Sequence, residues 1–148
     1  MALHRLVGEC PPLDTNSSYC NLLQCSHFGA TSIAAFIGDE LTGSVTGYLV
    51  PGRHDTLFVW QVAVHPDARG KKLGRTMLRK LTERMLVQGV RFIETSITPE
   101  NEASWRLFTG FATEMRAQTV RSVMFERMLH FQGVHDTEYL LRIGPMDG

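Results

Sequence analysis

Residues 62–75 read Val62-Ala63-Val64-His65-Pro66-Asp67-Ala68-Arg69-Gly70-Lys71-Lys72-Leu73-Gly74-Arg75, and here the end of an apolar strand runs into a basic helix start. The apolar run from Leu57 predicts a buried strand, which Pro66 ends because proline cannot donate to a sheet. The first amides of a helix have no partner inside it, so a helix starting after Gly70 can bind an anion. Four cations add attraction for a phosphate or pyrophosphate: Arg69, Lys71, Lys72 and Arg75. The alternative is an exposed basic helix start without a ligand.

Apolar periodicity predicts the order helix, helix, three strands, helix, strand, helix and two strands. The expected helices span 4–10, 19–28, 71–88 and a segment that starts at Thr98, with Pro99 at its first helical position. The expected strands span 31–37, 41–50, 57–64, 91–97, 119–125 and 138–143. The strand 57–64 lacks polar alternation, which is typical of a central strand covered on both faces.

Length, charge and cysteine content restrict the class of protein. With 148 residues and 43% hydrophobic side chains, the chain is expected to form a single domain over 1–148. Fifteen basic and fifteen acidic residues cancel, so we expect a small-molecule ligand and neither nucleic acid nor a membrane as partner. No apolar run approaches the ~20 residues of a membrane span. Cys10, Cys20 and Cys25 form no CxxC pair, which favours reduced thiols and a cytoplasmic protein.

The segment Arg69-Gly70-Lys71-Lys72-Leu73-Gly74 resembles the signature Arg/Gln-x-x-Gly-x-Gly/Ala of the GCN5-related N-acetyltransferase (GNAT) family. The resemblance implies the GNAT acyl-CoA N-acyltransferase fold, an α/β architecture (α+β mixed sheet) whose central, mostly antiparallel sheet has splayed fourth and fifth strands and is flanked by helices. It also implies acetyl-CoA (coenzyme A) as acetyl donor, with the pyrophosphate held by residues 69–75 and the pantetheine arm along Val62, Ala63 and Val64. Lys72 departs from the signature, because the family usually has a glycine there.

The family opens with a short strand before its first helix, and this first strand is apparently missing here, because helical residues begin almost at Met1. We therefore expect a shortened N-terminus or a start codon placed late, and a weaker sheet edge beside an intact coenzyme site. Paired subunits are common in the family, and the exposed edge near the closing strands would suit one, so a homodimer is expected.

Three segments resemble one branch of the family more narrowly: residues 10–20, 58–64 and 98–104. They are similar to the L-2,4-diaminobutyrate acetyltransferases of ectoine biosynthesis. This resemblance implies transfer of acetyl from acetyl-CoA to the 4-amino group of L-2,4-diaminobutyrate, by direct attack in a ternary complex, to give N4-acetyl-L-2,4-diaminobutyrate. The alternatives are a GNAT acetyltransferase for another small amine or a peptide, and a non-catalytic acyl-CoA-binding module.

A diamine substrate with two ammonium groups needs an anion to receive it. Asp14, in the loop before the helix at 19–28, is the expected partner of an ammonium. Tyr19 and Trp60 are expected to enclose the short aliphatic chain with their flat faces. The substrate site is also assigned Thr95, His135 and Glu138. The alternatives are that Asp14 only caps its turn and that Trp60 is a core residue.

The attacking amine must be neutral, so a base must accept a proton from an ammonium with an ordinary pKa near ~10. Glu138 is the leading candidate for this base, and the preceding His135 is expected to orient it or to relay the proton. The alternatives are an exposed glutamate at a strand end and a loop histidine. A zinc pair is disfavoured because no third ligand stands at a suitable spacing, so no metal is expected.

The thioester oxygen develops negative charge during transfer, and a free N–H of a bulged strand near Ala63 or Val64 is expected to stabilise it. Many family members protonate the leaving sulfur with a tyrosine where this chain has Phe108. Either the thiolate leaves unprotonated, or Tyr19 or another hydroxyl serves. Asn101 is expected to bond the pantetheine arm near Phe108; the alternative is a polar residue in a first helical turn.

Overall fold

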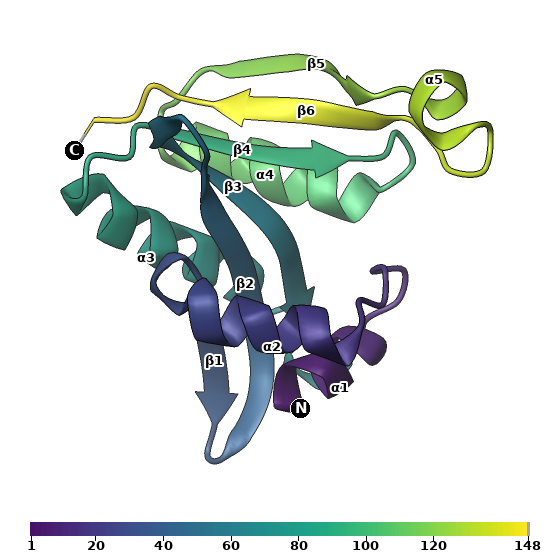
Figure 1. Cartoon of the computed structure of the whole chain (residues 1–148). Coiled ribbons are helices and arrows are strands. Elements are labelled where there is room, and N and C mark those ends of the chain that lie inside the picture. Colours follow the sequence, from purple (N-terminus) through teal and green to yellow (C-terminus); the bar gives the residue numbers. More distant parts are fainter. Residues whose placement is uncertain (148) are drawn as a thin grey trace.

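The computed structural model describes residues 1–147, which form a six-stranded sheet with helices on both faces (Figure 1). The strands are β1 (Ile33–Ile37), β2 (Glu40–Val50), β3 (Arg53–Val64), β4 (Phe92–Ile97), β5 (Thr119–Phe125) and β6 (Glu138–Ile143). The helices are α1 (Ala2–Gly8), α2 (Ser18–His27), α3 (Leu73–Val87), α4 (Glu102–Glu114) and α5 (Arg127–Phe131), with short 3-10 turns at Gly29–Thr31 and Pro66–Ala68. The strand order is β1-β2-β3-β4-β6-β5, in which β3 and β4 are parallel and the other neighbours antiparallel. The predicted mixed, mostly antiparallel sheet is confirmed.

The central strands β3 and β4 diverge along their length (Figure 1). Their pairing ends at Val59 and Thr95, although β3 continues to Val64 and β4 to Ile97. At this last pair, the Thr95 hydroxyl donates to the Val59 carbonyl at 3.0 Å. The backbones beyond this point are free to separate, which gives the splay that the sequence predicts.

A β-bulge at Trp60 accompanies this separation. Consecutive residues of β2 have Gln61 and Val59 as their partners, so Trp60 is an extra residue in β3. A bulge bends its strand and increases the local twist. This strand was expected to be bulged, and the free N–H that was placed near Ala63 or Val64 lies three to four residues beyond the bulge.

Gly47 of β2, the partner of Val59, allows a close approach of the two backbones beside the bulge. A Cβ at Gly47 would lie 2.8 Å from the Phe58 carbonyl oxygen, closer than any ordinary contact. The two backbones can therefore approach here only because Gly47 has no side chain.

Two apolar clusters hold the helices on opposite faces of the sheet. The larger joins α3 and α4 to the strands, with side chains that include Leu57, Val59, Leu78, Leu81, Ile93, Phe108, Phe111 and Ile143. The smaller joins α1 to β3 and consists of Leu3, Leu6, Val7, Cys10 and Ala63. Because Trp60 is an extra residue, Leu57 and Val59 point into the larger cluster and Ala63 into the smaller one. Both faces of β3 are thus buried, which explains its lack of polar alternation.

Two helical segments differ from the prediction. The last long helix begins at Glu102 rather than Thr98, because Asn101 caps it: its Oδ1 accepts a hydrogen bond from Ser104 N at 3.2 Å. The segment between β5 and β6 was expected to be a loop and contains α5, capped by Glu126, whose Oε2 accepts from Leu129 N at 2.6 Å. α5 has five residues, too few for an apolar period to be seen.

The sheet has two exposed edges. Within residues 1–147 no strand precedes α1, and β1 is an edge strand on which Phe36 and Ile37 are exposed. The other edge is β5, where Val120 and Val123 are exposed. No segment of residues 1–147 pairs with the outer side of either edge, and the homodimer stays a prediction.

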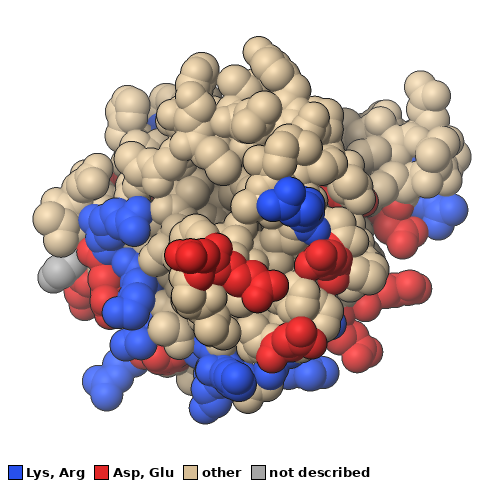
Figure 2. Space-filling view, turned by 90° about the horizontal axis from the view of Figure 1, so that it is seen from below, with Lys and Arg blue, Asp and Glu red and all other residues tan. Residues whose placement is uncertain are grey.

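The surface carries both signs of charge. On the face shown in Figure 2, Lys and Arg side chains lie in small groups beside Asp and Glu, without a continuous basic area. Among residues 1–147, no helix has the length and apolar character needed to cross a membrane.

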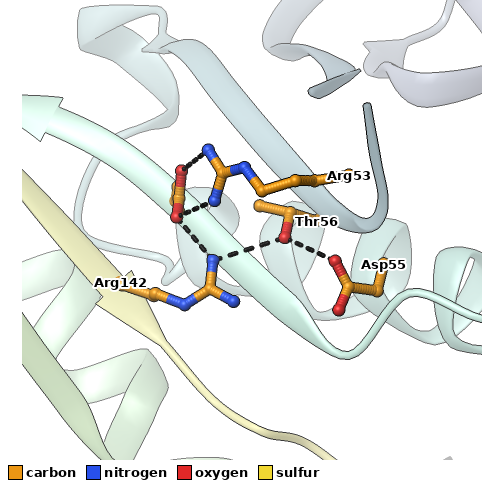
Figure 3. A network of polar contacts seen from close by, with 5 residues as sticks. Arg53, Asp55, Thr56 and Arg142 are labelled. Atoms are coloured by element: carbon orange, nitrogen blue, oxygen red, sulfur yellow. Dashed lines mark hydrogen bonds and ion pairs between the residues drawn. The ribbon is translucent and has the colours of Figure 1, made fainter. Parts of the chain in front are cut away.

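A charged network ties β3, β4 and β6 together at the paired end of the splay (Figure 3). Glu94 is 2% exposed and receives hydrogen bonds from Arg53 Nη1 at 2.8 Å and Nη2 at 3.0 Å. Arg142 Nη1 donates to the same carboxylate and, at 3.3 Å, to Thr56 Oγ1, which donates to Asp55 Oδ1 at 2.9 Å. Burial alone would raise the pKa of Glu94, but the two guanidinium groups outweigh it and lower this pKa.

We expect Glu94→Gln to lower the free energy of unfolding by about 2–3 kcal/mol at pH 7, because two guanidinium groups lose their charged acceptor. The folded-state pKa of Glu94 lies below its unfolded value, so its contribution is full above the ordinary carboxyl pKa of about 4.3 and disappears as the pH falls through the lowered pKa. Urea unfolding of both proteins at several pH values measures this. Glu83→Gln, on the exposed side of α3, is the control; a difference from wild type that does not shrink in acid would contradict the prediction.

Candidate active site

Two adjoining cavities fill the opening between β3 and β4. The narrow cavity, about 550 Å³, lies against the start of α3, and the wide cavity, about 880 Å³, lies between β3, β4 and α5. They share five lining residues: Pro12, Leu13, Val62, Asn101 and Ser104. One ligand can therefore extend from one cavity into the other.

The narrow cavity has an anion-binding end at the start of α3. Thr76 N donates to Lys72 O in the first helical bond, so the amides of Leu73, Gly74 and Arg75 have no partner within the helix. These three residues line the cavity together with Arg69, Gly70 and Lys72. A pyrophosphate can bind at this end, because unpaired amides, the helix dipole and two cations meet there.

Lys72 takes a backbone conformation that normally belongs to glycine. It has φ 57° and ψ 28°, in the left-handed region, and it precedes the first residue of α3. A side chain in this region costs about 1–2 kcal/mol relative to an ordinary conformation. The chain therefore keeps the turn that a glycine would make, and places a cation beside the free amides.

The other two predicted cations lie further from this end. Lys71 is exposed and does not line the narrow cavity. The guanidinium of Arg75 lies against Gly110 of α4, in the space that a Cβ at residue 110 would occupy. It forms an ion pair with Glu114 at 4.0 Å. Arg75 thus contributes its amide to the cavity while its side chain reaches α4.

The open side of β3 presents backbone groups to both cavities. His65 N donates to Thr42 O of the neighbouring segment at 2.8 Å. Because bonded and non-bonded residues alternate in an antiparallel pair, the N–H and C=O groups of Val62 and Val64 point away from β2. Both valines line the narrow cavity. Ala63 points the other way, fully buried against α1, and the structure gives it no contact with the cavity.

Cys10 is a cavity residue to which the sequence assigned no role. Its thiol is 2% exposed, lines the narrow cavity and donates to the Val64 carbonyl at 3.2 Å, where Arg69 Nε also donates at 3.3 Å. Burial raises the pKa of Cys10 although Arg69 opposes the rise, so the group is a neutral thiol. Cys10 and Arg69 together fix the end of β3.

The wide cavity contains a buried carboxylate with a free oxygen. The Glu138 side chain is 19% exposed, and its Oε2 is buried and accepts no hydrogen bond from the described residues. Burial raises the pKa of Glu138, the nearby His135 and the Ser96 side chain oppose this rise, and the charge of Asp14 adds to it. A carboxylate with a raised pKa and a vacant acceptor suits a general base.

His135 is oriented toward Glu138. Its Nδ1 lies 2.6 Å from the Asp136 carbonyl oxygen, which can only accept, so Nδ1 carries the proton. Its Nε2 then faces Glu138 Oε1 at 3.9 Å. The tilted ring packs on Phe131 of α5, with 4.5 Å between ring centroids. The predicted pair therefore exists, and α5 holds it in place.

The loop that carries Asp14 is pinned to β3 by Gln61. Gln61 Nε2 donates to the Asp14 carbonyl at 2.9 Å, and Asn16 Nδ2 donates to Gln61 Oε1 at 3.0 Å. The Asp14 side chain lines the wide cavity, and Ser17, not Asp14, caps the following helix. Because of the bulge, Trp60 and Gln61 both line this cavity, although strand alternation predicted only one of them.

The remaining predicted residues fall into two groups. Trp60, Thr95, Asn101 and Phe108 line the wide cavity, but Thr95 uses its hydroxyl on Val59, and Asn101 uses its Oδ1 as a helix cap. Tyr19 lies outside both cavities and is 70% exposed, on α2, none of whose residues lines either cavity. A hydroxyl that does lie where the cavities meet is that of Ser104.

The comparisons with known proteins agree with this geometry. The model of the Acetyltransferase (GNAT) family matches residues 2–111. The chain belongs to the GNAT family. It is 54% identical over 143 residues to the L-2,4-diaminobutyric acid acetyltransferase of Methylotuvimicrobium alcaliphilum, and 46% identical over 143 residues to that of Vibrio cholerae. Each alignment covers 97% of this chain and 83% of the relative.

A solved structure of another protein has the same fold as this GNAT chain. The diaminobutyrate acetyltransferase EctA from Paenibacillus lautus, in complex with its substrate L-2,4-diaminobutyric acid and coenzyme A, superposes with a TM-score of 0.92 at 34% identity. The match covers 99% of this chain and 89% of that one. The predicted GNAT fold is confirmed.

We expect Lys72→Gly to raise the free energy of unfolding by about 1 kcal/mol, because glycine takes the left-handed conformation without steric cost. Lys71→Gly is the matched control: its φ is not positive, so this change should lower stability by about 0.5–1 kcal/mol through the more flexible unfolded chain. Chemical denaturation of both variants measures this. Equal losses of stability in the two variants would show that Lys72 is not strained.

Proposed function

We propose that this GNAT enzyme transfers the acetyl group of acetyl-CoA to the 4-amino group of L-2,4-diaminobutyrate, giving N4-acetyl-L-2,4-diaminobutyrate for ectoine biosynthesis. The observation that carries the proposal is the buried Glu138, with its free oxygen and raised pKa, beside Asp14 in a cavity continuous with an anion-binding helix start. The diaminobutyrate acetyltransferases to which the chain is similar support the choice of amine.

The narrow cavity fits the acetyl donor. Its free amides at Leu73 and Gly74, with Arg69 and Lys72, suit the diphosphate of coenzyme A. The Val64 carbonyl already accepts from Cys10 and Arg69, but the N–H and C=O of Val62 and the N–H of Val64 have no strand partner. These groups suit the amides of an extended pantetheine arm, in the way that a strand adds to a sheet edge. The thioester would then lie where the two cavities meet, with the amide of Val62 or Val64 toward its oxygen.

The wide cavity fits the acetyl acceptor. Asp14 and Glu138 provide negative charge for the ammonium groups, and Trp60 provides a flat apolar wall for the short chain. The ammonium gives one proton to Glu138, and the lone pair of the neutral amine attacks the thioester carbon to form the N–C bond of a tetrahedral intermediate. The intermediate collapses as the C–S bond breaks and the sulfur leaves as a thiolate, and the nitrogen gives its second proton to this thiolate or to solvent. His135 Nε2 lies 3.9 Å from Glu138 Oε1 and, with the ring proton on Nδ1, is an acceptor to which Glu138 can pass on the proton.

The state of the cysteines bears on the cellular setting. The three cysteines are free thiols, and Cys10 is buried among apolar side chains. Reduced thiols and a biosynthetic activity suit the cytoplasm. We propose that residues 1–148 act there as one catalytic unit.

The proposal predicts that the purified protein releases thiol from acetyl-CoA in the presence of L-2,4-diaminobutyrate, and releases much less with ornithine, lysine or spermidine. A colorimetric thiol assay over this amine panel measures it, and mass spectrometry identifies the acetylated nitrogen. Turnover of a larger amine but not of diaminobutyrate would replace the proposed substrate. Tight coenzyme binding with no turnover of any amine would indicate a binding module.

Glu138→Gln should lower kcat by about 100-fold or more, because the amine loses its proton acceptor. In the wild type, kcat/KM should fall as the pH drops through the raised pKa of Glu138, when this carboxyl gains its proton. The variant should lose this acidic limb and become faster only toward the pKa of the free amine, near ~10. Glu83→Gln is the control for loss of a carboxylate. An unchanged acidic limb in Glu138→Gln would assign the base to another group.

A further inference from the structure

The wide cavity has an uneven set of charges. Its described lining includes four carboxylates: Asp14, Glu100, Asp136 and Glu138. Among the same lining residues, the single Lys or Arg is Arg127. An acidic cavity suits a diamine, but an amino acid also brings a carboxylate, which needs a cation or amide donors of its own. No residue was predicted from the sequence to bind this substrate carboxylate.

Arg127 is the first residue of α5, the helix that the sequence did not predict. Its guanidinium is held by Asp136, with Nη1 3.4 Å from Oδ1, and by the Gly133 carbonyl, to which Nη2 donates at 3.3 Å. Its backbone N donates to Thr137 Oγ1 at 3.1 Å. The residue is thus fixed at both backbone and side chain before any ligand arrives.

These contacts leave Arg127 able to bind an anion. A guanidinium carries five N–H donors, and the two contacts that hold it are long. The side chain is 55% exposed and that of Asp136 is 51% exposed, so the ion pair is open to the cavity and to solvent. A planar guanidinium that is held but not saturated suits bidentate binding of a carboxylate.

We propose that Arg127 binds the α-carboxylate of the substrate and thereby makes the enzyme select a diamino acid over a plain diamine. This assignment rests on the proposed function. The carboxylate end of the substrate then lies toward α5, and the amine to be acetylated lies toward Glu138 and the shared lining of the two cavities.

Other cations are less well placed for this role. Arg121 of β5 stacks on Trp105 and Tyr139, with 4.5 Å and 4.1 Å to the ring centroids, and it does not line the wide cavity. His135 lines it but directs Nδ1 to the Asp136 carbonyl and Nε2 to Glu138. Arg106 lines only the narrow cavity.

The test compares L-2,4-diaminobutyrate with 1,3-diaminopropane, which is the same chain without the carboxylate. For the holoenzyme with saturating acetyl-CoA, Arg127→Gln should lower kcat/KM for diaminobutyrate by about 10- to 100-fold, mainly through KM, as expected for a lost charged hydrogen bond. The value for 1,3-diaminopropane should change by less than about twofold, because that amine never used the guanidinium. Arg127→Lys, which keeps the charge without the planar fork, should give an intermediate loss.

Two controls separate this role from a purely structural one. Lys80→Gln removes a cation from the exposed side of α3 and should change neither substrate. Thermal melts of both Arg127 variants show whether α5 stays folded, and a damaged α5 would lower the rates for both amines together. Suppose that the wild type acetylates diaminobutyrate. The assignment of Arg127 is then overturned, and the proposed function is kept, if the Arg127 variants lose equal activity on the two amines or lose none on diaminobutyrate. A wild type without activity on diaminobutyrate would overturn it together with the proposed function.

Discussion

The structure depends on one constraint, which is that β3 and β4 pair as far as Val59 and Thr95 and no further. The Thr95 hydroxyl and the bulge at Trp60 mark the point where the strands part. The buried Glu94 with its two arginines holds the strands together at the paired end. The outward backbone groups of Val62 and Val64 are thereby left without a strand partner. Buried backbone groups have to find other partners, as the Val64 carbonyl does with Cys10 and Arg69. The opening is therefore a binding site because the sheet cannot close it.

The two ends of this opening differ in chemistry. At one end, amides at the start of α3 and the side chains of Arg69 and Lys72 favour negative charge. At the other end, Asp14 and Glu138 favour positive charge. A nucleotide thioester and a cationic amine would each be attracted to one end and repelled from the other, so electrostatics alone orients both substrates toward the shared residues between the cavities.

Regular elements were predictable from the sequence, because apolar periodicity follows the two faces of a sheet and one side of a helix. The anion site at residues 69–75 was likewise readable, since Pro66, Gly70 and the cations each act locally. The bulge at Trp60, the contacts of Cys10 and the role of Gln61 depend on residues far apart in the chain. Tyr19 lies outside the site for a similar reason: α2 packs so that none of its residues lines either cavity, and this packing depends on segments far along the chain.

The proton transfer gains from the burial of Glu138. An ammonium beside a carboxylate is normally the stable state, since the amine pKa of about 10 lies far above that of a carboxylic acid. Burial penalises the charged form of each group more than its neutral form, so it lowers the pKa of the amine and raises the pKa of Glu138. The difference between the two pKa values therefore becomes smaller. Asp14 works in the opposite direction on the amine, because its charge stabilises the ammonium while it raises the pKa of Glu138. A substrate with two ammonium groups resolves this conflict if Asp14 holds the one that stays charged and Glu138 takes the proton of the other.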